Sequence, residues 1–215
     1  MLVPKHFAEN RRDALHSLIE ANPLATLIVA RRSHVVVDHF PLVLERESGT
    51  YGILRGHVPI DNEIWTQFDG HRKAVAVFHG PQAYITPKWY PSKQEHGKVV
   101  PTWNYVVVHA HGIPRVIRDE DWLLQHLEEL TDKHEAASDR PWKVSDAPRE
   151  FTSKLLRLIV GIELPISSLE GKWKISQNRP GSDRAGVVAG LSEGKDENSR
   201  KMLGLMHECR AFADS

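Results

Sequence analysis

The chain has 215 residues, and its 28 lysines and arginines are balanced by 28 aspartates and glutamates, so its formal net charge is zero. A chain of this length can bury a core of its own, but it lacks the positive surplus typical of nucleic-acid or anionic-membrane binding. Its single cysteine, Cys209, excludes an intrachain disulfide and any two-cysteine motif. No apolar run reaches the roughly 20 residues of a membrane span, and the start has no signal-peptide pattern. We therefore expect a soluble, cytoplasmic protein.

The chain opens with a predicted helix. Leu15, Leu18 and Ile19 recur at helical spacing. The stripe ends before Pro23, because the residue that precedes a proline disfavours the helical region.

Short strands are predicted after this helix. Three β-branched and apolar segments are separated by turn residues at Arg32-Ser33 and at 46–49, which predicts an antiparallel meander. A capping pair then predicts a short helix over 61–68. The strand segments are 25–31, 35–45, 51–58 and 73–80.

The segment 80–112 is rich in aromatic residues and prolines. Prolines at 81, 87, 91 and 101 fix backbone angles and remove amide donors, so we expect short strands joined by rigid turns. Planar rings beside hydrogen-bonding side chains suit a flat heteroaromatic ligand, although an aromatic β core explains the same pattern. The side chains concerned are Thr86, Trp89, Tyr90, Thr102, Trp103, Asn104 and Tyr105.

Helices interrupt the strands in the second half of the chain. Leucines at three- and four-residue steps predict an amphipathic helix capped by Asp121. A polar loop, a brief helix and a strand follow, and then a basic, turn-prone stretch and a final helix. These segments are 138–148, 151–157, 158–171, 172–191 and 196–210.

Six or seven short strands in the first half predict a mainly β protein with peripheral helices, of the α+β class, built on an antiparallel barrel. We expect a single domain with a helical insert at about 119–157 and a helical C-terminal tail at about 183–210.

Metal and nucleophile chemistry have little support. His109 and His111 fall on one face of a predicted strand and could ligate a metal or haem. No HExxH motif, cysteine or acidic pair adds a third ligand nearby, so we expect no metal. No GxSxG elbow or phosphate-binding glycine motif is present, and no catalytic residue can be assigned.

Six sequence blocks in order carry a family resemblance. They are DHFPLVLE, LRGHV, VFHGPQAYITPKWYPSK, VPTWNY, HAHG and KISQNR. Together they resemble the PaiB family of FMN-binding negative transcriptional regulators, from about Pro4 to Leu191. The resemblance implies a split β-barrel related to the pyridoxamine-phosphate-oxidase flavoproteins. It also implies a homodimer that binds FMN at the boundary of barrel and subunit.

The resemblance also implies cofactor-binding residues. Tryptophan can cover the isoalloxazine face, while amide and hydroxyl groups bind its polar edge. A tail block with lysine and arginine suits a phosphate, although a solvated basic turn is the alternative. The implied residues are His39, Pro41, Arg55, Gly56, His57, Asn62, Thr86, Trp89, Tyr90, Thr102, Trp103, Asn104, Lys174, Gln177, Asn178 and Arg179.

The chain departs from the family pattern after His57, where Ile60 and Asp61 stand in place of an expected arginine and its neighbour. Loss of that cation is expected to weaken phosphate binding unless Arg55 or Lys174 replaces it.

Two main functional hypotheses remain open. The first is a flavin-binding regulator with a DNA or protein partner. The segment 170–185 has a basic surplus of only two, which makes direct DNA binding doubtful. The second is an FMN-dependent oxidoreductase or flavin reductase. A haem-binding split-barrel protein is a weaker alternative.

Overall fold

The computed structural model describes residues 1–31 and 34–213, and the chain divides into two compact units. Unit 1 comprises Met1–Leu18, His79–Val108 and Glu170–Ser215, and unit 2 comprises Ile19–Phe78 and His109–Leu169. The expectation of a single domain stays a prediction. The turn predicted at Arg32-Ser33 lies outside the described residues.

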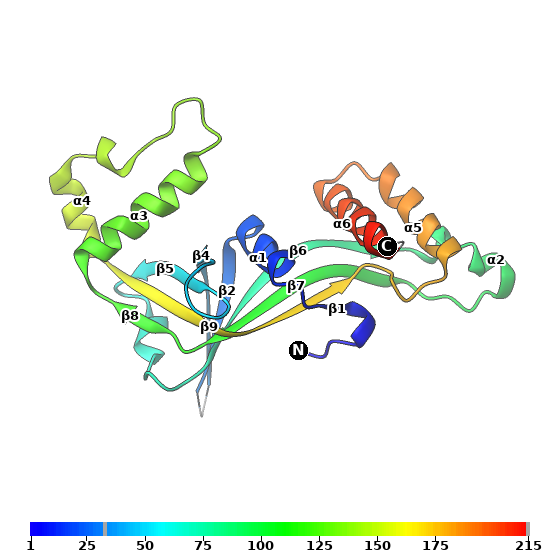
Figure 1. Ribbon diagram of the computed structural model, residues 1–215, viewed down its shortest axis with the longest axis horizontal. Coiled ribbons are helices and arrows are strands. Elements are labelled where there is room, and N and C mark those ends of the chain that lie inside the picture. The colour runs from blue at the N-terminus through cyan, green and yellow to red at the C-terminus, as the bar shows by residue number, and fades with distance from the viewer. Residues whose placement is uncertain (32–33, 214–215) are drawn as a thin grey trace. The chain divides into compact units, whose positions relative to one another are not determined.

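In the described part of the chain, nine strands form a sheet with the order β3-β2-β6-β7-β9-β5-β4, and β1 and β8 each pair with β9 (Figure 1). Antiparallel pairing joins β2 to β3 and β6, β5 to β4 and β9, and β9 to β1 and β8, which agrees with the predicted antiparallel meander. The strands are β1 (Ala8–Glu9), β2 (Leu24–Ala30), β3 (Val35–Pro41), β4 (Val43–Glu45), β5 (Ile53–Pro59), β6 (Ala74–Ile85), β7 (Thr102–Gly112), β8 (Arg115–Ile117) and β9 (Ile159–Lys174).

Helices connect and flank these strands. None of the described helices is long and apolar enough to cross a membrane. The α-helices are α1 (Arg12–Ala21), α2 (Ser92–His96), α3 (Glu120–Glu135), α4 (Arg149–Leu156), α5 (Gly181–Glu193) and α6 (Glu197–Ala213). The 3-10 helices are η1 (Lys5–Phe7), η2 (Glu63–Gln67), η3 (Pro87–Trp89) and η4 (Val144–Asp146).

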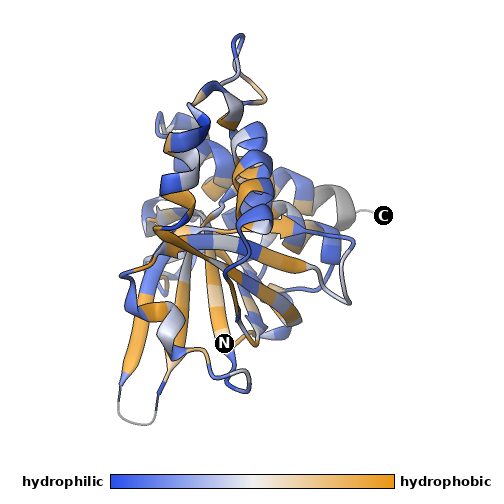
Figure 2. Ribbon diagram, turned by 90° about the vertical axis from the view of Figure 1, so that its left-hand side faces the viewer, coloured by the Kyte–Doolittle hydropathy of each residue, from blue (hydrophilic) through white to orange (hydrophobic). Residues whose placement is uncertain are grey.

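The core of unit 2 follows strand alternation. Strand β2 buries Ala25, Leu27 and Val29 on one face, and it pairs with β3 and β6. Strand β5 pairs with β4 and β9. Figure 2 shows long apolar stretches on the strands, whereas the helices alternate between apolar and hydrophilic residues. The mixed helices have the pattern expected of elements that bury one face. In the strands it is burial that alternates, as in β2, and not the residue type.

Unit 1 packs its helices through apolar side chains and glycines. Helices α5 and α6 lie side by side and bury Leu191 and Met202 (Figure 1). A Cβ at Gly186 would come within 1.8 Å of the Trp89 carbonyl oxygen, and one at Gly190 within 2.2 Å of the Trp89 ring. Glycine at both positions therefore allows α5 to approach η3 closely.

The prolines interrupt the strands less than their number predicts. Strand β6 runs unbroken through Gly80 and Pro81, and β7 extends for 11 residues after Pro101. Strand β2 pairs with β6 only from Ala74 to Val77, so Pro81 lies beyond that ladder and its missing N–H breaks no bond with β2. The expectation of short strands on both sides of Pro81 is wrong for this reason.

Two helix predictions also need correction. Within the stretch 172–191, expected to be turn-prone, residues 175–180 do form turns. Residues 181–191 instead belong to α5, because Gly186 and Gly190 serve helix packing and not chain reversal. Helix α3 is capped by Asp119, whose carboxylate accepts a 2.7 Å bond from the Trp122 amide, so Asp121 lies inside the first turn.

Candidate cofactor site

The predicted cofactor residues are divided between the two units. Unit 1 holds Thr86, Trp89, Tyr90, Thr102, Trp103, Asn104, Lys174, Gln177, Asn178 and Arg179. Unit 2 holds His39, Pro41, Arg55, Gly56, His57 and Asn62. We describe each group within its own unit.

One face of the sheet in unit 1 carries exposed aromatic rings. Tyr84 of β6 is 50% exposed and Trp103 of β7 is 52% exposed, and their ring centroids lie 5.8 Å apart at 69°. Tyr105 projects from the same face of β7 as Trp103, because alternate residues of a strand point the same way. Exposed aromatic surface of this kind is available to a planar ligand.

Two lysines of β9 lie over this aromatic surface. The Lys172 and Lys174 ammonium nitrogens are 5.3 Å and 6.0 Å from the centre of the Tyr105 ring. Lys174 also donates to the Thr102 hydroxyl and, at 2.5 Å, to the Trp103 carbonyl oxygen.

No carboxylate among the described residues neutralises this pair. Burial lowers the pKa of Lys174, and the positive charges of Lys172 and Arg179 lower it further. The recorded bonds of both lysines go to uncharged oxygens. An anion bound at this point would therefore relieve a repulsion between cations.

Two of the predicted amides, Asn104 of β7 and Gln177 of the tail block, form hydrogen bonds within the protein. Asn104 is 1% exposed and exchanges hydrogen bonds of 2.9 and 3.2 Å with the Ser176 hydroxyl. The Gln177 amide donates to the Trp173 carbonyl and accepts from the Ile175 amide at 2.8 Å. These groups stabilise the end of β9, and ligand contact by Asn104 and Gln177 stays a prediction.

The remaining residues of the unit 1 group lie in the segments that follow β6 and β9. The Thr86 hydroxyl caps η3 by accepting from the Lys88 amide at 3.3 Å. Tyr90 is buried, with the Arg179 guanidinium 4.7 Å from its ring centre. Asn178 is exposed. The structure thus brings Trp103, Thr102 and Lys174 to one surface.

The polar residues predicted in unit 2 are already bonded within the protein. Arg55 forms ion pairs with Glu45 at 2.8 Å and Glu163 at 3.2 Å. Asn62 donates to Asp38 and caps η2 by accepting from the Ile64 amide at 2.9 Å. These groups have first to give up bonds before they can hold a phosphate.

The other members of the unit 2 group have structural partners too. His39 shares a 2.9 Å hydrogen bond with the Thr26 hydroxyl across the β2–β3 pair. A Cβ at Gly56 would lie 2.8 Å from the Pro41 carbonyl oxygen, so glycine allows close packing of β5 at this point.

His57 has a partner that sequence reasoning missed. Its Nδ1 lies 3.2 Å from Nε2 of His126 on α3, and His126 stacks on Trp122 with ring centroids 5.3 Å apart. Trp122 in turn packs against Gly161 of β9. His126 is separated from His57 by 69 residues, and no local motif marks it.

Burial keeps this histidine pair neutral. It lowers the pKa of His57, and it lowers the pKa of His126 to about 4, with the charges of His57 and Arg55 as smaller causes. In the described part of the chain, the buried Nδ1 of His126 has no hydrogen-bond partner. We therefore interpret the pair as a packing element between α3 and β5.

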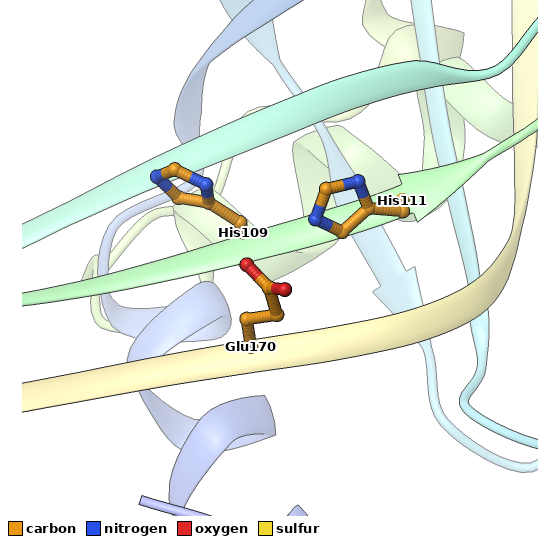
Figure 3. A group of neighbouring side chains, drawn as sticks. All are labelled: His109, His111 and Glu170. Carbon is orange, nitrogen blue, oxygen red and sulfur yellow. The ribbon is translucent and has the colours of Figure 1, made fainter. Parts of the chain in front are cut away.

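His109 and His111 project from one face of β7, as predicted, with ring centroids 6.3 Å apart (Figure 3). Glu170, drawn with them, belongs to unit 1, where its carboxylate lies 2.9 Å from the terminal ammonium of Met1. The expectation that no metal binds here stays a prediction.

The fold places this chain in the class of mainly antiparallel split β-barrels, and comparison with known proteins identifies the family. The model of the family described as "Putative FMN-binding domain" matches residues 1–168. Since this range covers most of the chain, the protein belongs to that family. The resemblance to PaiB is thereby confirmed, and the match stops short of Lys172 and Lys174.

Two curated relatives agree with this assignment. "Protease synthase and sporulation protein PAI 2" of Bacillus subtilis (strain 168), which is PaiB, is 27% identical over 208 residues, or 97% of each chain. An uncharacterized protein of Emericella nidulans is 34% identical over 219 residues, covering 86% of this chain and 87% of that one.

Solved structures support the fold. The FAD and heme binding protein from Mycobacterium smegmatis has a TM-score of 0.54 at 19% identity, with 78% of this chain and 73% of that chain covered. The flavocytochrome Anf3 from Azotobacter vinelandii has a TM-score of 0.56 at 15% identity, with 83% and 73% covered. The predicted class, a mainly antiparallel split β-barrel with peripheral helices, is confirmed, and the family indicates a flavin cofactor.

Proposed function

We propose that this protein binds FMN and that the unit 1 surface holds it. The observation that carries the proposal is the pair Lys172 and Lys174, which has no neutralising carboxylate in the described chain. The pair lies over the ring of Tyr105, two residues along β7 from the exposed Trp103. A phosphate dianion and a planar ring are the two chemical features that such a surface fits.

The residues of this surface have separate tasks. Lys172 and Lys174 hold the phosphate through charge-assisted hydrogen bonds, and the fixed bond from Lys174 to the Trp103 carbonyl couples the phosphate site to the ring site. Trp103 and Tyr84 cover the isoalloxazine and exclude water from it. FMN, when bound, supplies one- and two-electron redox chemistry, and the protein orients it.

Riboflavin tests the phosphate contribution directly, because it is FMN without the phosphate. Flavin fluorescence titration of the purified protein should give an affinity for FMN at least about tenfold higher than that for riboflavin, because one charge-assisted hydrogen bond contributes about this factor to binding. FAD, whose phosphates are esterified, should bind more weakly than FMN. Equal affinity for FMN and riboflavin contradicts the proposed phosphate site.

We also propose that the protein works as a homodimer in the reducing cytoplasm. Strand β3 is at one end of the strand order, and its Val35 and Val37 are 58% and 50% exposed. An apolar edge strand of this kind favours burial against a second copy. Sedimentation that finds a stable monomer with flavin bound rules the dimer out.

A further inference from the structure

A hollow of about 460 Å³ opens beside Trp103 in unit 1. Three aromatic side chains line it: Tyr84, Trp89 and Trp103. Its volume lies within the roughly 300–1,000 Å³ of small-molecule sites, and aromatic lining is characteristic of them. The proposed phosphate surface of Lys172 and Lys174 is not part of its lining.

The walls of this hollow are held by packing. The Trp89 indole lies against α5 where Gly190 leaves room for it. Leu191 of α5, which is 1% exposed, contributes an apolar wall. Tyr84 and Trp103 meet edge to face at 69°. A planar ligand therefore meets rings whose positions are already set, which reduces the entropic cost of binding.

Two uncharged amides and one carboxylate are among the polar groups at the rim. The side chains of Gln82 and Asn198 line the hollow and are exposed, and neither has a recorded hydrogen bond within the described chain. The charged group in the lining, Asp196, already accepts from the Ser199 amide at 2.9 Å and hydroxyl at 2.6 Å. The amides can therefore bind a donor and acceptor pair, and the described lining holds no lysine or arginine to bind an anionic ligand.

We infer that this hollow binds a second planar ligand: an uncharged heteroaromatic ring with a carbonyl or carboxamide at its edge. The rings of Tyr84, Trp89 and Trp103 form the walls that contact the ligand, and the amides of Gln82 and Asn198 bind its edge. The inference deepens the proposed function and rests on it for the role of the ligand. Tyr84 and Trp103 border both sites, so a ring bound here lies next to the flavin ring.

Nicotinamide is a suitable probe, because it is a small uncharged ring with a carboxamide edge. Titration of the isotope-labelled full-length protein should shift the indole N–H signals of Trp89 and Trp103 saturably, with other indoles unmoved. Assignment follows from Trp89→Phe and Trp103→Phe. The absence of saturable shifts at these two indoles overturns the inference.

The variants separate this site from the flavin site. Gln82→Ala combined with Asn198→Ala should weaken nicotinamide at least about fivefold and leave FMN affinity unchanged, since both side chains are exposed and lie outside the phosphate surface. Tyr84→Ala should weaken nicotinamide too. The matched control is Tyr51→Ala in unit 2, where Tyr51 is 36% exposed, and it should have no effect.

Competition experiments distinguish a failure of the second-ligand inference from a failure of the proposed phosphate site. If FMN displaces nicotinamide competitively, the hollow is the flavin's own ring site and the second-ligand inference is wrong. If Lys172→Ala with Lys174→Ala leaves FMN binding intact while nicotinamide still shifts Trp89 and Trp103, the proposed phosphate site fails and the hollow stands.

Discussion

The two units differ in whether carboxylates neutralise the cations that match the family pattern. In unit 2, Arg55 is neutralised by Glu45 and Glu163 on neighbouring strands. In unit 1, the charged groups that act on Lys174 are further cations, Lys172 and Arg179. A basic residue at a family position is therefore available to an anion only where the surrounding structure leaves its charge uncompensated.

The sharpest way to break this comparison is to remove the unit 1 cations. Lys172→Ala with Lys174→Ala should weaken FMN on the order of 100-fold, because two charge-assisted hydrogen bonds are lost. Flavin fluorescence titration measures the change, and Lys133→Ala on α3 is the control.

Arg55→Met makes the opposite test in unit 2. We expect little change in FMN affinity and a loss of stability, because Glu163, which is largely buried, loses its partner. If Arg55→Met weakens FMN more than the lysine pair does, the assignment of the phosphate to unit 1 is wrong.

The histidine pair predicts a pH dependence confined to unit 2. The pKa of His126 is lowered to about 4, so between pH 6.5 and about 4 the unfolded chain binds a proton that the folded chain does not. Stability should fall by roughly 3 kcal/mol as the pH drops through this window. Denaturant unfolding at a series of pH values measures it.

His126→Phe should flatten the pH profile, because the group responsible is absent. His134→Gln on the same helix should leave the profile unchanged, since His134 is exposed. A wild-type profile with no slope between pH 4 and 6.5 would falsify the reading of a neutral buried pair.

Helix α5 depends on the absence of side chains at its contact with η3. Gly186→Ala should destabilise the protein by roughly 3 kcal/mol, since a Cβ there would come within 1.8 Å of the Trp89 carbonyl oxygen. Gly204→Ala on α6 meets nothing within 4 Å and should be neutral or slightly stabilising. Thermal unfolding of both variants provides the comparison, and equal effects contradict the packing argument.

The exposed rings are expected to contribute less than the charges. Trp103→Ala should weaken FMN several fold, about 1 kcal/mol of stacking. Trp142→Ala, a control at 48% exposure in unit 2, should not affect FMN binding.

Asn104→Ala should lower stability by about 1–3 kcal/mol, because the buried Ser176 hydroxyl loses its partner. If an Asn104 variant keeps full stability but binds FMN weakly, the result supports the predicted contact between Asn104 and the ligand.

The small basic surplus of the chain's most basic segment argues against strong DNA binding. The segment 170–185 has a basic surplus of only two, and a dimer doubles it to about four phosphate contacts, against roughly six to ten for an efficient binder. Anisotropy at about 150 mM salt should therefore find no nanomolar, sequence-selective binding to the upstream region of the protein's own gene. Such binding, if found, means that the protein is a direct DNA reader.

Local patterns in the sequence were sufficient for the family, for most of the strands and for α1, α3, α4 and α6, because residue alternation, helical spacing and caps are short-range signals. These local patterns gave wrong predictions where the structural role of a residue depends on a neighbour that is distant in the sequence. Gly186 and Gly190 suggested turns, since nothing nearby in sequence shows that Trp89 packs on them.

The sequence by itself determined which residue types are present for a flavin: aromatic rings, amides and cations in recognisable blocks. Only the tertiary structure decided which of them remain available. Asn104 is bonded to Ser176, 72 residues away, and Arg55 to Glu163, 108 residues away, whereas Lys172 and Lys174 lie over Tyr105 without a carboxylate in the described chain. Pairing between remote strands sets these partners, and a single sequence contains no local signal for it.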